Sequence, residues 1–192
     1  MVMCQPKFSE DIYMTKPTPD NTVFVMIDIQ ERFRPVIEGI DGVARNAGIL
    51  NKAAEILDVP LLVTEQYPEG LGHTMAEIHI PGSAATFEKT RFSIFEGEIH
   101  DWLARQGRDW LVLYGIETHV CVLQSALEAV QRGWNVQVVA DAASSRTAAN
   151  RERALASLAH AGVTIATTEM VLFELLDRAD HPQFRAVSKL IK

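Results

Sequence analysis

The stretch LVLYGIETHVCVLQSALEA, residues 111–129, decides the fold of this chain. Its first four residues are apolar and stop at Gly115, a pattern typical of a strand buried on both faces. A helix is expected next, with Thr118 as its N-cap, because a threonine hydroxyl can accept a hydrogen bond from a backbone N–H about three residues on. Cys121 then falls in the first helical turn, where the helix dipole favours the thiolate, the nucleophilic form of cysteine. The stretch therefore predicts a strand–turn–helix unit that presents a cysteine.

The same alternation of apolar strands and helices continues on both sides of this stretch. Further strands are predicted at 22–27, 60–64, 85–89, 136–140 and 163–166. Helices are predicted at 41–57, 96–105, 148–161, 170–176 and 181–191, the last with Pro182 near its first position. Alternating strands and helices predict an α/β fold with three layers, α/β/α, around a mainly parallel sheet. Residues 1–17 are interpreted as an N-terminal arm and 18–192 as a single domain.

Length and composition limit the classes of function. The chain has 192 residues, of which 47% are hydrophobic, enough for one domain with a sizeable core. A net charge of −7 argues against a nucleic-acid partner, because phosphate binding needs clustered Lys and Arg. No apolar run approaches the roughly 18 residues of a membrane span, and no signal pattern opens the chain, so we expect no membrane partner and a cytoplasmic protein. Cys4 and Cys121 do not form a disulfide framework.

Three side chains capable of chemistry are predicted at one edge of the sheet. Asp28 follows the strand 22–27, Lys89 ends the strand 85–89, and Cys121 follows the central strand. The carboxyl ends of parallel strands meet at a common edge, where such sheets bind ligands. There Asp28 can accept the thiol proton, while Lys89 orients the aspartate and balances charge. Backbone N–H groups at the helix start can stabilise an oxyanion.

Each of these residues also has a structural interpretation. A lone Cys121 can be a small buried hydrophobe. Asp28 with Glu31 fits a capping box and can serve only to begin a short helix. Lys89 can be a solvated charge at a strand end. Periodicity alone favours these three interpretations.

The long segment after the second strand contains candidate metal ligands. His73 and His79, with Glu65, have a spacing that matches no compact ligand motif. We therefore expect no metal and no other cofactor. His119 precedes the nucleophile and is expected to be exposed or in the pocket wall, not a catalytic base.

An apolar pocket above a nucleophile needs walls, and the aromatic residues Phe33, Tyr67 and Phe92 follow three of the predicted strands. The residues expected to line a substrate pocket are Gln30, Phe33, Tyr67, Phe92 and Thr118.

Four sequence segments together resemble one known family. These are VMIDIQERF (25–33), FEKTRFSIF (87–95), GIETHVCV (115–122) and VVADAASSR (138–146). Over residues 18–191 the chain resembles the isochorismatase-like cysteine hydrolases, which include nicotinamidases and N-carbamoylsarcosine amidohydrolase. The segments come in the order, and at the strand ends, that the family requires.

The resemblance is closest to the isochorismatase domain-containing subgroup, through residues 60–72 and 181–192. It implies a parallel sheet of about six strands and a catalytic triad of Asp28, Lys89 and Cys121. It also implies a cis peptide bond between Ile116 and Glu117. The N–H groups of Glu117 and Cys121 would then form the oxyanion hole. Family members commonly form dimers or larger homo-oligomers.

Departures from the family patterns narrow the expected chemistry. Nicotinamidases carry an Asp-x-His metal motif where this chain has Glu65-Gln66-Tyr67, which argues against a metal and against nicotinamide as substrate. Isochorismatases that cleave a vinyl ether tend to lack the cysteine that is present here. We therefore predict a hydrolase that cleaves an amide-type C–N bond in a small molecule through a thioester. Two alternatives stay open: a vinyl-ether hydrolase with Asp28 as general acid, and a non-catalytic oligomeric binding protein.

Overall fold

All six strands of the computed structural model, which describes residues 16–192, lie in one parallel sheet. The strand order is β3-β2-β1-β4-β5-β6. The strands are β1 (Thr22–Ile27), β2 (Leu61–Gln66), β3 (Ala85–Lys89), β4 (Trp110–Ile116), β5 (Asn135–Ser144) and β6 (Thr164–Ala166). Cys4 and nearly all of the predicted N-terminal arm lie outside the described residues.

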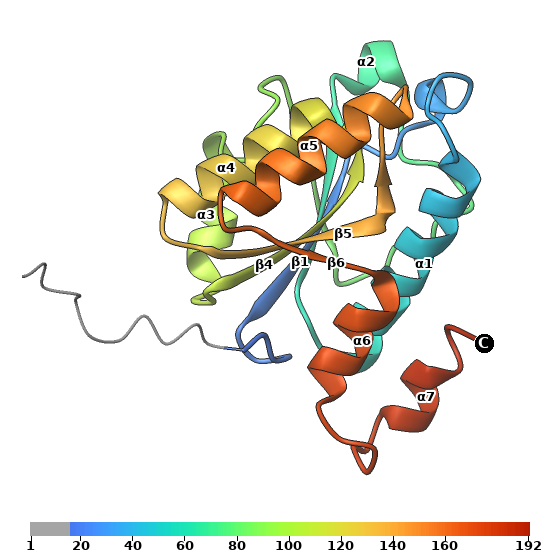
Figure 1. Cartoon of the computed structure of the whole chain (residues 1–192), viewed down its shortest axis with the longest axis vertical. Coiled ribbons are helices and arrows are strands. Elements are labelled where there is room, and N and C mark those ends of the chain that lie inside the picture. The colour runs from blue at the N-terminus through green and yellow to red at the C-terminus, as the bar shows by residue number, and fades with distance from the viewer. Residues whose placement is uncertain (1–15) are drawn as a thin grey trace, which may run out of the picture.

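Helices cover both faces of this sheet (Figure 1). One face packs against α1 (Ile40–Leu57), α6 (Thr168–Leu176) and α7 (Phe184–Ser188). The other packs against α3 (Gly97–Arg105), α4 (Leu123–Gln131) and α5 (Ala148–His160). Alternate residues of β1 point into the two cores, because successive side chains of a strand face opposite ways. The predicted three-layer α/β/α fold is confirmed. Among residues 16–192, no helix is both long and apolar enough to cross a membrane.

The strand order places a crevice between β1 and β4. The chain first builds β2 and β3 on one side of β1, then crosses through α3 and adds β4 on the other side. Parallel sheets of this order bind ligands at the carboxyl ends of the strands where the direction of winding reverses. Asp28 follows β1 there, and the turn with Cys121 follows β4.

The turn after β4 differs from the prediction in four ways. The strand continues through Gly115 to Ile116, and the next turn, Thr118–Val122, is π-helical. Thr118 is not the N-cap: its hydroxyl donates to the Ser144 carbonyl oxygen at 2.9 Å, and Glu117 occupies the capping position. The expected cis bond is also wrong, since residues 16–192 contain no cis peptide. Glu117 turns the chain instead, with a φ of 54°.

The C-terminal helix is shorter than predicted. Helix α7 covers only Phe184–Ser188, not 181–191. The amide N–H of Gln183 donates to His181 Nδ1, and that of Phe184 donates to the His181 carbonyl oxygen. These local hydrogen bonds form a turn, so Pro182 lies before the helix and not in its first turn.

Gly115 allows β1 and β4 to approach closely next to the crevice. A Cβ atom at this position would lie 2.1 Å from the Ile27 carbonyl oxygen, and the φ of Gly115 is +145°. We expect Gly115→Ala to lower the free energy of unfolding by about 3 kcal/mol, since it combines backbone strain with a steric clash. Urea unfolding followed by circular dichroism measures the change.

The matched control is Gly48→Ala in α1, where an added Cβ meets nothing within 4 Å. This variant should be unchanged or more stable by up to about 1 kcal/mol, from helix propensity. A loss below about 1 kcal/mol for Gly115→Ala would contradict the close approach.

Candidate active site

Asp28 is buried directly beyond the end of β1, with 1% of its surface exposed. Its Oδ1 accepts a hydrogen bond from the Thr64 hydroxyl at 2.8 Å, and its Oδ2 accepts one from Lys89 Nζ at 2.7 Å. The short helix that follows, Glu31–Phe33, has Gln30 at its N-cap position and no side-chain cap. The capping-box interpretation of Asp28 is therefore wrong, and the carboxylate faces the ends of β2 and β3.

Lys89 is buried at the end of β3, so the interpretation as a solvated charge is also wrong. Its side chain has no exposed surface, and four oxygen atoms surround the ammonium group. These are Asp28 Oδ2 and Gln66 Oε1, both at 2.7 Å, and the carbonyl oxygens of Arg91 at 3.3 Å and Phe92 at 3.2 Å. A buried charge needs such compensation, and it fixes the ammonium beside the carboxylate.

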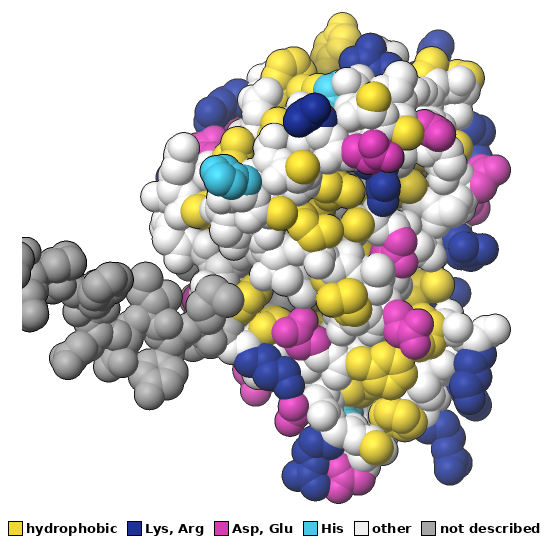
Figure 2. Space-filling view, viewed as in Figure 1, with side chains coloured by type: hydrophobic (Ala, Val, Ile, Leu, Met, Phe, Trp, Pro, Cys, Tyr) yellow, Lys and Arg dark blue, Asp and Glu magenta, His cyan; other side chains and the backbone are white. Residues whose placement is uncertain are grey.

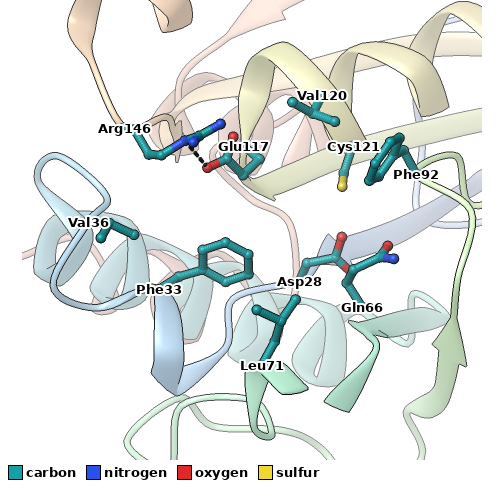
Figure 3. Close-up of a pocket in the computed structure, with 10 residues that line it drawn as sticks. All are labelled: Asp28, Phe33, Val36, Gln66, Leu71, Phe92, Glu117, Val120, Cys121 and Arg146. Atoms are coloured by element: carbon teal, nitrogen blue, oxygen red, sulfur yellow. Dashed lines mark ion pairs between the residues drawn. The ribbon is translucent and has the colours of Figure 1, made fainter. Parts of the chain in front are cut away.

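Cys121 lies in the π-helical turn after β4, with its sulfur directed toward Asp28 (Figure 3). Burial, followed by the negative charge and hydrogen bonding of Asp28, raises the pKa of the thiol to about 12, although Lys89 acts to lower it. The expectation of a lowered pKa is therefore wrong: desolvation and a nearby carboxylate outweigh the helix end. The resting group is a thiol beside a carboxylate that can accept its proton.

A cavity of about 420 Å³ opens above these groups. Its walls are mainly apolar, as is typical of small-molecule sites. The lining residues are Asp28, Phe33, Val36, Gln66, Leu71, Phe92, Glu117, Val120, Cys121 and Arg146.

Two of the five expected pocket residues, Phe33 and Phe92, line this cavity, and three lie elsewhere. Gln30 is fully buried and ties a loop to β2: its Nε2 donates to the Gly72 carbonyl oxygen at 2.6 Å, and its Oε1 accepts from the Gln66 N–H at 2.8 Å. Tyr67 is 54% exposed at the start of helix α2 (Pro68–Leu71). Thr118 is buried under the turn, where it holds β5.

An ion pair at the cavity was missed from the sequence. Arg146, just beyond the end of β5, places its Nε 3.0 Å from Glu117 Oε1 (Figure 3). The Glu117 side chain is 9% exposed and that of Arg146 57%. The position of Arg146 after a parallel strand was the available signal, because it lies on the same edge as Asp28 and Cys121. Gln66, at the end of β2, carried the same signal, whereas Val36 and Leu71 lie outside any strand-end pattern.

The histidines considered as metal ligands face different acids. His73 Nδ1 lies 2.8 Å from Glu65 Oε2, and His79 Nε2 lies 2.9 Å from Glu55 Oε2. Within residues 16–192, no group of three or more His, Cys, Asp or Glu side chains is placed to hold a metal ion. His119, in the turn, is partly buried, with Nδ1 3.0 Å from Ser145 Oγ.

Comparison with known proteins shows the family of this chain. The family model for the isochorismatase domain matches residues 22–170, which hold all three candidate catalytic side chains. The chain belongs to the isochorismatase family. It is 42% identical over 176 residues to isochorismatase domain-containing protein 1 of Danio rerio, and the match covers 91% of this chain and 62% of that protein. The chain thus spans less than two thirds of that relative's length.

Two further relatives cover more of their own length. Isochorismatase domain-containing protein 2A of Mus musculus is 40% identical over 174 residues, covering 91% of this chain and 84% of that protein. The solved structure of the MAR1 ribonuclease from Caenorhabditis elegans is 37% identical, with a TM-score of 0.89 and coverage of 92% of each chain. The isochorismatase-like α/β fold therefore extends over nearly all of the described residues.

Proposed function

We propose that this isochorismatase-family protein hydrolyses an amide-type C–N bond in a small molecule, with Cys121 as the nucleophile. The observation that carries the proposal is the buried Lys89–Asp28 pair beside the Cys121 thiol at the floor of an apolar cavity. Burying an ion pair costs free energy, and a thiol held next to a carboxylate is the arrangement that nucleophilic catalysis needs. Family membership supports a hydrolase.

In the first half of the reaction, Asp28 takes the proton of Cys121 as the sulfur attacks the amide carbonyl carbon. The raised pKa of the thiol favours proton transfer in step with formation of the C–S bond, over a thiolate formed beforehand. The backbone N–H groups of Glu117 and Cys121 are the proposed donors to the carbonyl oxygen as it becomes negative. Asp28 then gives the proton to the nitrogen, the C–N bond breaks, and the amine leaves.

In the second half, water hydrolyses the thioester on Cys121. Asp28 takes a proton from the water as its oxygen attacks the carbonyl carbon, and returns that proton to the departing sulfur. The products are a carboxylic acid and the free thiol. Lys89 keeps Asp28 oriented and balances charge throughout, through the 2.7 Å contact to Oδ2.

The test is an intact-mass screen for an acyl group on Cys121 across a panel of small amides. We expect a mass increase equal to the acyl part of one or more amides, together with release of the amine. The Cys121→Ala variant should show neither, with a melting temperature nearly unchanged, because the substitution removes only a small side chain next to a cavity. If Cys121→Ala retained turnover, Cys121 would not be the nucleophile.

Two other functions are separated by the same assay. The vinyl-ether alternative predicts isochorismate cleavage that survives in Cys121→Ser, with Asp28 as the acid. The relative called a ribonuclease makes RNA a second control substrate. A net charge of −7 and the apolar lining favour a small molecule over RNA. On the face in Figure 2, Lys and Arg side chains are also interleaved with Asp and Glu.

A homo-oligomer and a cytoplasmic location stay predictions. On the face in Figure 2, hydrophobic side chains gather over α6 and α7. Met170 is 53% exposed and Phe173 is 40% exposed in α6. These exposed side chains support a contact with another copy.

A further inference from the structure

A second polar feature of the cavity, the Glu117–Arg146 ion pair, has no part in the proposed chemistry of Asp28, Lys89 and Cys121. Both residues line the cavity. Figure 3 shows Arg146 and Val36 at the end away from Cys121 and Phe92, so a substrate whose carbonyl reaches the sulfur would place its other end here.

The charges at the cavity balance. Lys89 compensates Asp28 at 2.7 Å, and Arg146 compensates Glu117 at 3.0 Å. A substrate carboxylate that bound Arg146 would compete with Glu117 and leave that buried carboxylate without its partner, which is costly. A substrate ammonium group that bound Glu117 would compete with the Arg146 guanidinium in the same way. The balance favours an uncharged substrate.

The ion pair can still accept and donate further hydrogen bonds, through Glu117 and Arg146 respectively. Among the described residues, Glu117 Oε2 is a buried oxygen with no hydrogen-bond partner. His119 Nε2 lies 3.4 Å from it without hydrogen-bond geometry. Each carboxylate oxygen can accept about two hydrogen bonds, so Oε1 also keeps an acceptor site beside its contact with Arg146. Arg146 is more than half exposed and carries further N–H donors.

We propose that the natural substrate is an uncharged amide whose far end carries both a hydrogen-bond donor and an acceptor, such as a second carboxamide. The donor binds the Glu117 carboxylate and the acceptor binds the Arg146 guanidinium, with the ion pair intact. This inference rests on the proposed function for the orientation of the substrate. It makes Glu117 and Arg146 specificity-determining residues.

The test uses chloroacetamides that share one linker and end in a carboxamide, a methyl, a carboxylate or an ammonium group. Each alkylates Cys121: the S–C bond forms, chloride leaves, and Asp28 takes the thiol proton, so no hydrolysis is needed. Intact mass spectrometry gives the rate for each probe. We expect the carboxamide probe to react about tenfold or more faster than the methyl, carboxylate and ammonium probes, because only it satisfies both groups. The inference would be overturned if all probes reacted at equal rates, or if the carboxylate probe reacted fastest.

Variants then assign the preference to the ion pair. In Glu117→Gln the carboxamide probe should lose most of its advantage, and the carboxylate probe should gain, because Arg146 is now unpaired. Arg146→Met should also reduce the carboxamide advantage, and it serves if Glu117→Gln does not fold. The control is Glu128→Gln, which removes a glutamate paired with Arg91 and Arg132 outside the cavity and should keep the wild-type order. An unchanged order in both cavity variants would contradict the proposal.

The two proposals fail in different ways. If no amide acylates Cys121 but the probe order is as expected, hydrolysis fails and the recognition stands. If amides acylate Cys121 without any preference among the probes, only the recognition fails.

Discussion

An Asp28→Asn variant should lose amide turnover by on the order of 10³-fold or more, while its Cys121 becomes more reactive toward iodoacetamide at pH 8. The two effects have opposite signs because the carboxylate has two consequences. It is the proposed proton acceptor and donor of both half-reactions. It is also a cause of the raised pKa of Cys121, second to burial.

The sign of the second effect follows from the groups around the sulfur. The charge of Asp28 raises the pKa of Cys121 and Lys89 lowers it. An asparagine removes the raising charge, so the pKa falls and more of the sulfur is thiolate at a given pH. Asparagine also tolerates the backbone at this position, where φ is 56°.

The measurement is the pH dependence of the alkylation rate, beside the turnover of the best amide from the screen. Asp58→Asn is a matched control, because Asp58 is an exposed aspartate that also has a positive φ of 54°. It should leave both readouts at the wild-type level. If Asp28→Asn kept substantial turnover, Asp28 would not be the proton-transfer group. If its alkylation slowed, the carboxylate would not be a cause of the raised pKa of Cys121.

Much of the fold was predictable from hydrophobic patterns. The strand β3 has the predicted bounds, 85–89, because the local sequence pattern alone is enough to define this short strand. The strand β5 runs to Ser144, four residues beyond the predicted end at 140. Its extension depends on pairing with β4 across an irregularity between Leu113 and Gly115, which no local pattern reveals. Boundaries set by a neighbouring strand are thus less visible in the sequence than elements set by their own periodicity.

The candidate site was predictable where topology alone brings residues together. Lys89 ends β3, while Asp28 and Cys121 follow β1 and β4, and parallel strands bring such ends to one edge. The electrostatic state was not predictable, because the pKa of Cys121 depends first on burial, which is a property of the packed molecule. The Glu117–Arg146 pair was also not predictable, because it depends on contact between the turns that follow β4 and β5.

Replacing Lys89 by methionine should lower the free energy of unfolding by about 3–5 kcal/mol at neutral pH, because it leaves a buried carboxylate without its countercharge. The side chains of Lys89 and Asp28 are 0% and 2% exposed, so water cannot take over this role. After the substitution, the Thr64 hydroxyl still donates to Oδ1 of Asp28. One neutral donor does not compensate a full charge.

Two features separate this effect from simple loss of packing. Protonation of the stranded carboxyl group removes the buried charge, so the destabilisation should shrink as the pH falls from 8 toward 5. The double variant Asp28→Asn/Lys89→Met should be more stable than Lys89→Met alone, since it removes both members of the pair. Urea unfolding at each pH measures both, with Lys52→Met, an exposed lysine of α1, as the control. A pH-independent loss, or a double variant less stable than the single one, would mean that packing and not charge makes Lys89 important for stability.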